Sequence, residues 1–305
     1  MEDSRTEGEG TYDTPGILSL ARVIEDRVQE LQLWKRVCHG AVALAGIAGM
    51  FLGHSYAYYT AVFGLLVEFA AFGLRHKASL LHGISRGAMR RVALVSANVL
   101  AEDSLEVTQL RAQLVMMEDF KERATRWEAR QAGREYYSTK ATEPTDRLFD
   151  IIFECAFWWE TLAQAAAKRA GRWIAAGAIG ILLLFSLGMM VGQLETREVI
   201  GTLAMQVGLV LIGVDLVENY LKWKDTGAAS RELLNRLSGA APLQEQVLLF
   251  LWLSDYFALT AGSPPIPTGV YEAQCDALDA ECIRILEQRE QSRTRVADKR
   301  AALLA

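Results

Sequence analysis

The segment YTAVFGLLVEFAAFGLRHK, residues 59–77, decides how the whole chain is interpreted. Its first sixteen residues are mostly apolar and include one formal charge, Glu68, before Arg75, His76 and Lys77 end the segment. Such a segment is typical either of a buried helix in a large helical protein or of a helix that spans a membrane. The surrounding sequence favours one of these two alternatives.

Formal charges are distributed unevenly along the 305 residues. The hydrophobic content of 51% and the net charge of −5 are intermediate between those of a soluble enzyme and of a membrane transporter. Between residues 37 and 74, however, Glu68 is the only formal charge, and residues 173–214 contain three charges, clustered in the middle. Each block is about 40 residues long, which fits two helices of roughly 20 residues joined by a tight turn. We therefore predict two transmembrane hairpins, over residues 37–74 and 173–217.

The flanks of these blocks predict the orientation of the hairpins. Lys and Arg residues lie outside both ends of each block, whereas the hairpin turns contain almost none. By the positive-inside rule, both termini and the segment between the hairpins are then cytosolic. The N-terminus, MEDSRTEGEG, is acidic and has no basic region or cleavage site, so we expect no signal peptide. The four predicted spans are Val37–Gly53, Tyr56–Leu74, Trp173–Gly192 and Val199–Val217.

The rest of the sequence predicts helices outside the membrane. Apolar residues recur at helical spacing between Ile17 and Trp34, which favours an amphipathic helix that leads into the first span. The segment between the hairpins contains one proline and many helix-forming residues. The predicted fold class is an all-α membrane protein with two transmembrane hairpins and a helical cytosolic bundle. Its predicted parts are a disordered acidic tail over residues 1–16, a cytosolic amphipathic helix over 17–36, hairpins over 37–74 and 173–217, a cytosolic helical segment over 75–172, and C-terminal cytosolic helices over 218–305.

The sequence contains no pattern that indicates catalysis, a cofactor or a metal. The common phosphate-binding, zinc-protease and nucleophile-elbow motifs are missing. The four histidines have no ligand spacing, and the negative net charge argues against nucleic-acid binding. We therefore predict no enzymatic activity and no bound cofactor, metal or nucleic acid. The cysteines form no CxxC pair and are predicted to be free thiols: Cys38, Cys155, Cys275 and Cys282.

Glu68 is the charged residue that lies furthest inside the predicted spans. An ionised carboxylate that faces lipid costs at least about 2.5 kcal/mol, so it needs water, a partner or a proton. Three interpretations remain open: a ring of carboxylates that lines an oligomeric pore, a neutral hydrogen-bonded carboxyl between spans, and a side chain extended towards Arg75. Gln206 and Asp215 of the fourth span are the other pore-lining candidates, although solvation at the interface also explains Asp215.

Small residues at three- and four-residue spacing indicate packing surfaces on two of the predicted spans. Such spacing lets the backbones of neighbouring helices approach closely. Contacts within one subunit and contacts between the subunits of a homo-oligomer both fit this pattern. The candidate packing residues are Gly46, Gly49 and Gly53 in the first span, and Gly188 and Gly192 in the third.

Several short motifs lie between and after the hairpins: Tyr136-Tyr137, Arg147-Leu148, Glu154-Cys155-Ala156-Phe157-Trp158, Ser254-Asp255-Tyr256-Phe257, Ser263-Pro264-Pro265-Ile266-Pro267 and Tyr271. Together with the two tight hairpins, these motifs resemble those of the SMODS-associating four-transmembrane effector family. The resemblance covers most of the chain from about residue 30, and the N-terminal segment ILSLARVIEDRVQELQLWKR departs from the family's form. It implies a membrane-disrupting effector of bacterial antiphage defence, without catalytic residues.

We therefore expect a multi-pass protein of the bacterial inner membrane that oligomerises and permeabilises this membrane on receiving a cytosolic signal. The resemblance implies that the signal is a nucleotide second messenger made by a neighbouring nucleotidyltransferase. The arginines of the chain are scattered and form no evident phosphate cradle, so we assign no residue to this signal. The alternatives are a regulated housekeeping ion channel or transporter, and a membrane scaffold that conducts no ions. The expected partners are the lipid bilayer, further copies of the chain and the nucleotide.

Overall fold

The computed structural model describes residues 16–51, 54–115, 120–131, 136–190, 198–239 and 246–304. Within these ranges every regular element is a helix, which confirms the all-α part of the predicted fold class. The helices are α1 (Ile17–Phe51), α2 (His54–Ser96), α3 (Leu105–Val115), α4 (Phe120–Gln131), α5 (Pro144–Met190), α6 (Glu198–Gly239), α7 (Gln246–Gly262), α8 (Thr268–Tyr271) and α9 (Cys275–Leu304).

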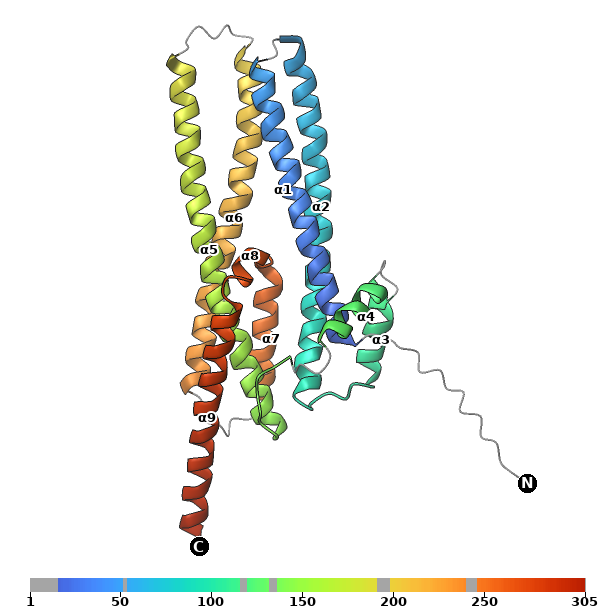
Figure 1. Ribbon diagram of the computed structural model, residues 1–305, viewed down its shortest axis with the longest axis vertical. Helices are drawn as coiled ribbons and strands as arrows, with labels where there is room; N and C mark the ends of the chain where they lie inside the picture. Colours follow the sequence, from blue (N-terminus) through green and yellow to red (C-terminus); the bar gives the residue numbers. More distant parts are fainter. Residues whose placement is uncertain are drawn as a thin grey trace, which may run out of the picture.

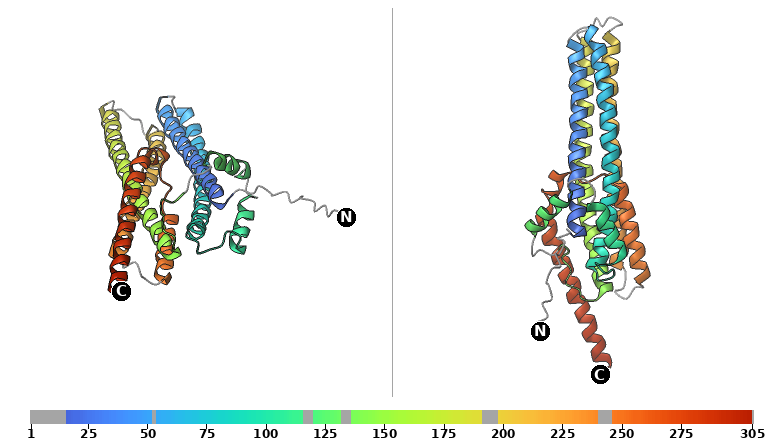
Figure 2. Two further views of the ribbon diagram at one scale, coloured as in Figure 1. Left: turned by 60° about the horizontal axis from the view of Figure 1, so that its bottom comes forward. Right: turned by 90° about the vertical axis from the view of Figure 1, so that its right-hand side faces the viewer.

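The four long helices form two antiparallel pairs that stand side by side. α1 pairs with α2, and α5 pairs with α6, as Figures 1 and 2 show. The upper ends of all four helices project beyond the rest of the molecule, whereas α3, α4, α7 and α8 pack beside their lower halves (Figure 1). α9 runs along the lower half of α5 and continues downwards to the C-terminus. The molecule therefore has a broad lower half and an upper half of four helices only.

The prediction of four membrane spans is wrong. In the parts of the chain that the structure describes, no helix contains a stretch that is both long and apolar enough to cross a membrane. The prediction rested on the scarcity of charged residues, which does not by itself make a segment apolar enough to span, because Gly, Tyr and His are also uncharged. The predicted continuity of the helices is confirmed: α1 runs unbroken through residues 36 and 37, and α5 runs unbroken through residues 172 and 173. The predicted transmembrane hairpins are accordingly replaced by long helices of mixed polarity.

The hydrophobic core lies in the lower half of the molecule. α1 contributes Leu20, Ile24 and Val28, which are fully buried and follow one another at four-residue spacing. Leu148 of α5 is fully buried against the same core. Each such side chain stabilises the fold by about 1.5–3 kcal/mol relative to an exposed one. By contrast, most of the large apolar side chains of α2 between Tyr59 and Phe72 are exposed.

Local sequence features determine where the helices of the lower half end and begin. α2 ends before Asn98, which adopts a left-handed conformation with a φ of 57°, and the Val99 amide then donates to the Leu94 carbonyl. α3 begins after Ser104, whose hydroxyl accepts a hydrogen bond from the Val107 amide at 3.4 Å. These two caps set the position of α3 beside α1.

Candidate functional site

An ion network joins the first helix pair to α6 just below the projecting helix ends. Lys35 Nζ of α1 lies 2.7 Å from Asp215 Oδ2 of α6, and Arg75 Nη1 of α2 lies 3.5 Å from Asp215 Oδ1. Arg75 Nη2 also lies 2.5 Å from Glu218 Oε2, and Lys222 Nζ lies 2.8 Å from Glu218 Oε1. Because Asp215 contacts cations from α1 and α2, it is the centre of the network.

α5 reaches the same level of the molecule through a contact at Gly171. A Cβ atom at this position would lie 3.5 Å from the ring of Tyr220, which follows Glu218 by two residues on α6. This is an ordinary van der Waals distance, so α5 lies beside Tyr220 of α6 at this level. Lys35, Arg75, Gly171 and Tyr220 thus mark one level that is shared by all four long helices.

Lys35 is the most deeply buried charge of the network, because its side chain is only 5% exposed. A buried ammonium group is tolerated only when a carboxylate or several acceptors compensate for its lost hydration. The spacing of Leu20, Ile24, Val28 and Leu31 continues to Lys35, so this lysine lies on the buried face of α1. That spacing could have identified Lys35 from the sequence, where it was interpreted only as a basic flank.

Glu68 lies above the network, towards the projecting end of α2. Its Oε2 is 3.8 Å from Nε2 of His39 on α1, which is too far for a hydrogen bond. Its Oε1 is buried and has no hydrogen-bond partner among the described residues. Arg75 contacts Asp215 and Glu218 instead of Glu68. The two other interpretations of Glu68, in a pore or as a neutral carboxyl, stay predictions.

The structure places the remaining predicted residues as follows. Asp215 lies in the ion network, with a side chain that is 16% exposed, and accepts a hydrogen bond from Asn219 at 3.3 Å. Its role in lining a pore stays a prediction. The other candidates lie outside the residues whose side chains and surroundings the structure describes: Gln206, Gly46, Gly49, Gly53, Gly188 and Gly192.

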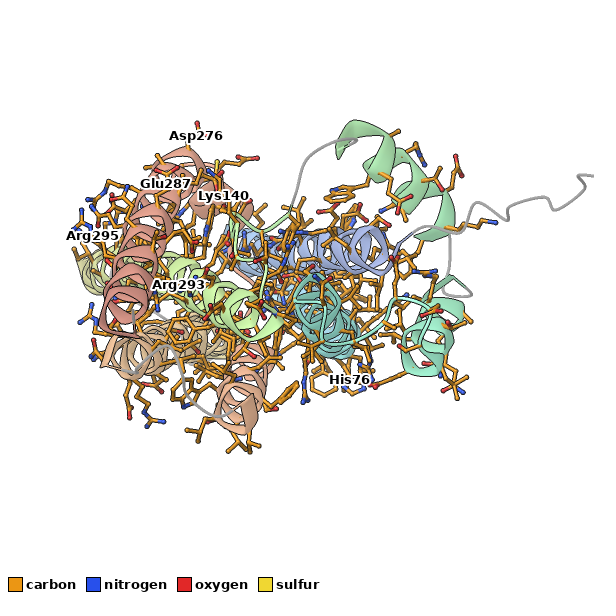
Figure 3. The ribbon with its side chains drawn as sticks, turned by 90° about the horizontal axis from the view of Figure 1, so that it is seen from below. His76, Lys140, Asp276, Glu287, Arg293 and Arg295 are labelled. Carbon is orange, nitrogen blue, oxygen red and sulfur yellow. The ribbon has the colours of Figure 1, made fainter. Side chains whose placement is uncertain are left out.

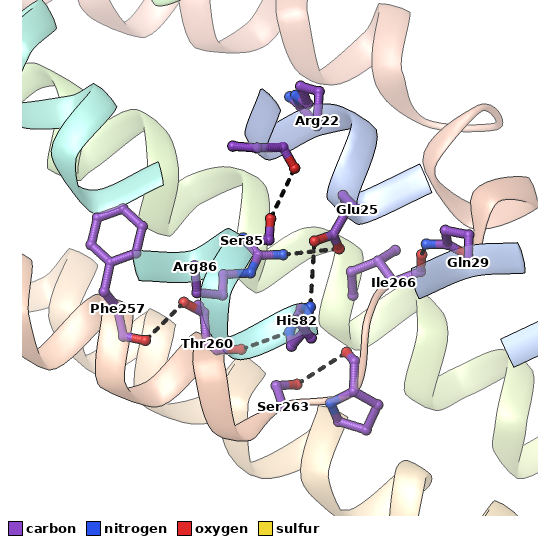
Figure 4. Close-up of polar contacts among 12 residues, drawn as sticks. Arg22, Glu25, Gln29, His82, Ser85, Arg86, Phe257, Thr260, Ser263 and Ile266 are labelled. Carbon is purple, nitrogen blue, oxygen red and sulfur yellow. Dashed lines mark hydrogen bonds and ion pairs between the residues drawn. The ribbon is translucent and has the colours of Figure 1, made fainter. Parts of the chain in front are cut away.

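A second polar cluster lies within the lower half, where α1, α2 and α7 meet (Figure 4). Glu25 Oε2 of α1 lies 3.4 Å from His82 Nδ1, and Glu25 Oε1 lies 3.5 Å from Arg86 Nη2, both of α2. His82 Nε2 is 3.3 Å from the Thr260 carbonyl of α7. Burial acts to raise the pKa of Glu25, but Arg86 and His82 outweigh it and lower this pKa to about 2. Glu25 is therefore ionised, and side chains of α2 stabilise its negative charge.

The segment between α7 and α8, residues 263–267, is held by both helix pairs. Gln29 Nε2 of α1 donates to the Ile266 carbonyl at 2.6 Å, and Trp223 Nε1 of α6 donates to the Pro264 carbonyl at 3.0 Å. Residues 264 and 265 are prolines, which have no N–H and favour an extended backbone whose carbonyls stay accessible. The segment is therefore a common acceptor for donors from α1 and α6.

Tyr136, Trp158 and Tyr271, from motifs that carry the family resemblance, lie beside this cluster and contact parts of the chain that are far away in the sequence. Arg22 of α1 donates to the Tyr136 hydroxyl at 2.5 Å. The Trp158 ring stacks on that of Tyr271, with 5.7 Å between centroids. The Arg86 guanidinium lies 4.4 Å from the centroid of the Trp159 ring. These contacts join α1 to the segment before α5, α5 to α8, and α2 to α5.

Glu154 is a buried carboxyl on α5 that the sequence did not indicate as a titrating group. It is 6% exposed, and Ser138 donates to it from its amide at 3.0 Å and from its hydroxyl at 3.3 Å. Burial raises the pKa of Glu154 to about 7, although the two Ser138 hydrogen bonds oppose the shift. Near neutral pH, therefore, this carboxyl exchanges its proton while it is enclosed in the core.

This raised pKa makes stability decrease as the pH increases. Above its ordinary pKa of 4.5 the Glu154 carboxyl ionises in the unfolded chain, whereas the folded chain keeps the proton up to about 7. Between these values the folded state binds more protons, so we expect wild type to lose roughly 3 kcal/mol of unfolding free energy as the pH rises through this window. The measurement is denaturant unfolding at several pH values, with Glu154→Gln as the matched control. Equal pH slopes for wild type and Glu154→Gln would contradict the assignment.

α9 packs on α5 through a buried ion pair beside a polar groove. Arg293 donates to both Asp150 oxygens, at 3.0 and 2.7 Å, and the Asp150 side chain is only 5% exposed. Figure 3 shows Arg293 and Glu287 on α9, with Lys140 near Glu287. The groove has a volume of about 410 Å³ and is lined mainly by Ser138, Lys140, Asp150, Glu287 and Glu290. Its acids outnumber its cations, so it does not suit a nucleotide phosphate.

The cysteines are free thiols, as predicted. Burial raises the pKa of Cys155 to about 12, and it also raises the pKa of Cys282, which is fully buried. Both thiols are therefore protonated at neutral pH and unreactive. We assign them to the core.

The polar clusters hold together helices that are far apart in the sequence. Within the described ranges, no group of three His, Cys, Asp or Glu side chains could hold a metal ion. Near the projecting ends, charged groups of different helices form ion pairs with one another. In the lower half, polar groups from segments that are far apart in the sequence contact one another.

Comparisons with family models, curated proteins and solved structures give no match. The resemblance to the four-transmembrane effector family stays a prediction.

Proposed function

We propose that the protein is an effector that acts on a lipid bilayer and permeabilises it. The observation that carries this proposal is the exposed apolar surface of α2 near its projecting end. Tyr59, Leu66, Phe69 and Phe72 are 63–70% exposed, which is unusual for such large apolar side chains. Covering this surface is worth about 25 cal/mol per Å², so a hydrocarbon phase would bind it strongly.

The exposed apolar surface extends to the other long helices. Leu44 of α1 is 69% exposed, Ile179 of α5 is 59% exposed and Val214 of α6 is 58% exposed. All of these residues lie above the level of the ion network. Contact with lipid hydrocarbon at this end would therefore involve both helix pairs. We call this part of the molecule the apolar end, defined by Leu44, Tyr59, Leu66, Phe69, Phe72, Ile179 and Val214.

The proposal includes self-association and a signal received by the lower half. Two helix pairs from one chain enclose too little space for an aqueous path, so several copies are needed to permeabilise a bilayer. The nucleotide second messenger implied by the resemblance is the proposed signal. The Glu25 cluster and the ion network connect the lower half with the apolar end through α1 and α2, which supports this arrangement.

Dye release from vesicles tests the proposal. Purified full-length protein is added to lipid vesicles that contain a self-quenched dye, and the same samples are then floated on a density gradient. We expect the protein to float with the vesicles and to release dye at a rate that rises more than linearly with protein concentration. Protein that stays at the bottom of the gradient would overturn the proposal. Flotation without release, with and without candidate nucleotides, would favour the non-conducting scaffold.

A further inference from the structure

We infer that the apolar end is bordered by a binding surface for the anionic phosphate headgroups of a bilayer. This inference rests on the proposed action at a bilayer and adds the class of lipid. It concerns residues 35–36, 75–77, 168–172 and 215–225, which we call the basic band. Contacts of Lys35 and Arg75 with α6, and of Gly171 with Tyr220, place these four segments at one level.

The basic band concentrates positive charge in an otherwise acidic chain. It contains nine Lys and Arg residues and three Asp and Glu residues, whereas the whole chain has a net charge of −5. Asp215 and Glu218 are already engaged by Lys35, Arg75 and Lys222. Lys168 and Arg172 form no ion pair with a described residue, so they add local positive charge that attracts anions.

Near this level an exposed cation lies close to an exposed apolar residue on each long helix. The pairs are Arg36 and Val37 in α1, Arg75 and Phe72 in α2, Arg172 and Trp173 in α5, and Lys224 and Leu221 in α6. On α1 the change from basic to apolar is not sharp, because Leu33 and Trp34 are exposed directly below Arg36. Cations beside exposed apolar residues suit the headgroup level of a bilayer.

α5 shows the change most clearly. Lys168 and Arg172 are exposed, lie one turn apart, and form no ion pair with any described residue. Trp173 follows directly and is 62% exposed, and Ile179 continues the exposed surface towards the apolar end. An exposed Trp between cations and apolar residues is typical of the headgroup level of a bilayer. Lys and Arg can also extend their charged ends towards headgroups while their stems contact apolar surface.

The chemistry of the cations suits lipid phosphates. Guanidinium groups bind phosphate oxygens through paired hydrogen bonds, and ammonium groups bind them as point charges. A basic residue near an anionic bilayer adds about 1 kcal/mol to binding, which is about fivefold in affinity. Removing Lys168 and Arg172 together should therefore weaken binding to anionic vesicles by about 30-fold, because roughly 1 kcal/mol is lost for each cation.

The experiment compares full-length Lys168→Gln/Arg172→Gln with a matched control, Lys121→Gln/Arg295→Gln. Both variants lose one lysine and one arginine, and Lys121 and Arg295 are exposed residues of the lower half; Figure 3 shows Arg295 on α9. Flotation is measured with vesicles of phosphatidylcholine alone and with phosphatidylglycerol added. We expect wild type and the control to prefer the anionic vesicles, and the Lys168/Arg172 variant to lose about 30-fold of that binding. The preference should weaken as salt is added.

The outcomes separate this inference from the proposed function. Equal binding of wild type to both kinds of vesicle would leave the action at a bilayer intact and overturn the inference. An equal loss of binding to anionic vesicles in the control variant would also overturn the inference, because binding would then depend on the net charge of the protein and not on the position of the cations. Displacement from anionic vesicles by dilute inorganic phosphate would show a site for a free anion and overturn it too. Failure of wild type to bind any vesicle would overturn the proposed function and the inference together.

Discussion

Asp215→Ala is expected to lower the free energy of unfolding by about 3–5 kcal/mol, because it leaves a buried lysine without its counter-charge. The Lys35 side chain is 5% exposed, and Asp215 is the one carboxylate within ion-pair distance of its Nζ among the described residues. Unfolding is measured with denaturant in a medium that keeps wild type monodisperse. A change of this size is a large part of the stability of an ordinary domain.

Two further variants make this result interpretable. Glu218→Ala removes a neighbouring carboxylate whose side chain is 34% exposed, and it is expected to cost about 0–1 kcal/mol. Lys35→Met/Asp215→Leu removes both charges and should recover much of the stability that Asp215→Ala loses, since no buried charge is left unpaired. If Asp215→Ala lowers the free energy of unfolding by no more than Glu218→Ala does, water or another acceptor must compensate the ammonium group of Lys35. If Asp215→Ala fails to fold, folding of Lys35→Met/Asp215→Leu still shows that the unpaired charge of Lys35 is the cause.

Phe69→Asp/Phe72→Asp is expected to reduce binding to vesicles by at least about 1,000-fold and to abolish dye release. The two side chains are 68% and 70% exposed on one face of the apolar end. Replacing an aromatic residue by aspartate in a hydrocarbon phase costs about 3 kcal/mol for each position on insertion scales. Because both positions are exposed, the substitutions should change the folding free energy by no more than about 0.5 kcal/mol.

Two controls accompany the aspartate variant. Leu80→Asp/Leu105→Asp places the same charges at exposed leucines of the lower half, which are 57% and 73% exposed, and it should bind vesicles as wild type does. Phe69→Leu/Phe72→Leu keeps the surface apolar and should retain most of the binding. Full dye release by the aspartate variant would contradict the proposed contact of α2 with hydrocarbon.

The sequence predicted the helices more reliably than their surroundings. Helical spacing of apolar residues correctly predicted the buried face of α1 through Leu20, Ile24 and Val28, because local periodicity reports directly which face is covered. The four membrane spans were wrong, because a scarcity of charges was taken to mean high hydropathy. Whether a segment forms a helix depends on its local sequence pattern. Whether that helix lies in water or in lipid depends on its whole exposed surface.

The partners of the candidate site could not be predicted in this way. Asp215 was named as a candidate, but its contact with Lys35 joins residues that are 180 positions apart. No periodicity within one helix specifies which residue of another helix will face it. The burial of Lys35 was predictable from its place on the buried face of α1, and that burial alone would have indicated a distant carboxylate.

The proline segment at residues 263–267 has a mechanical consequence. Gln29 and Trp223, from different helix pairs, donate to carbonyls two residues apart on the same short stretch of backbone. A stretch with two consecutive prolines is stiff, so relative movement of the pairs at this height would stretch one of the two hydrogen bonds. The segment therefore tethers the two helix pairs to one another at this height and opposes their separation there.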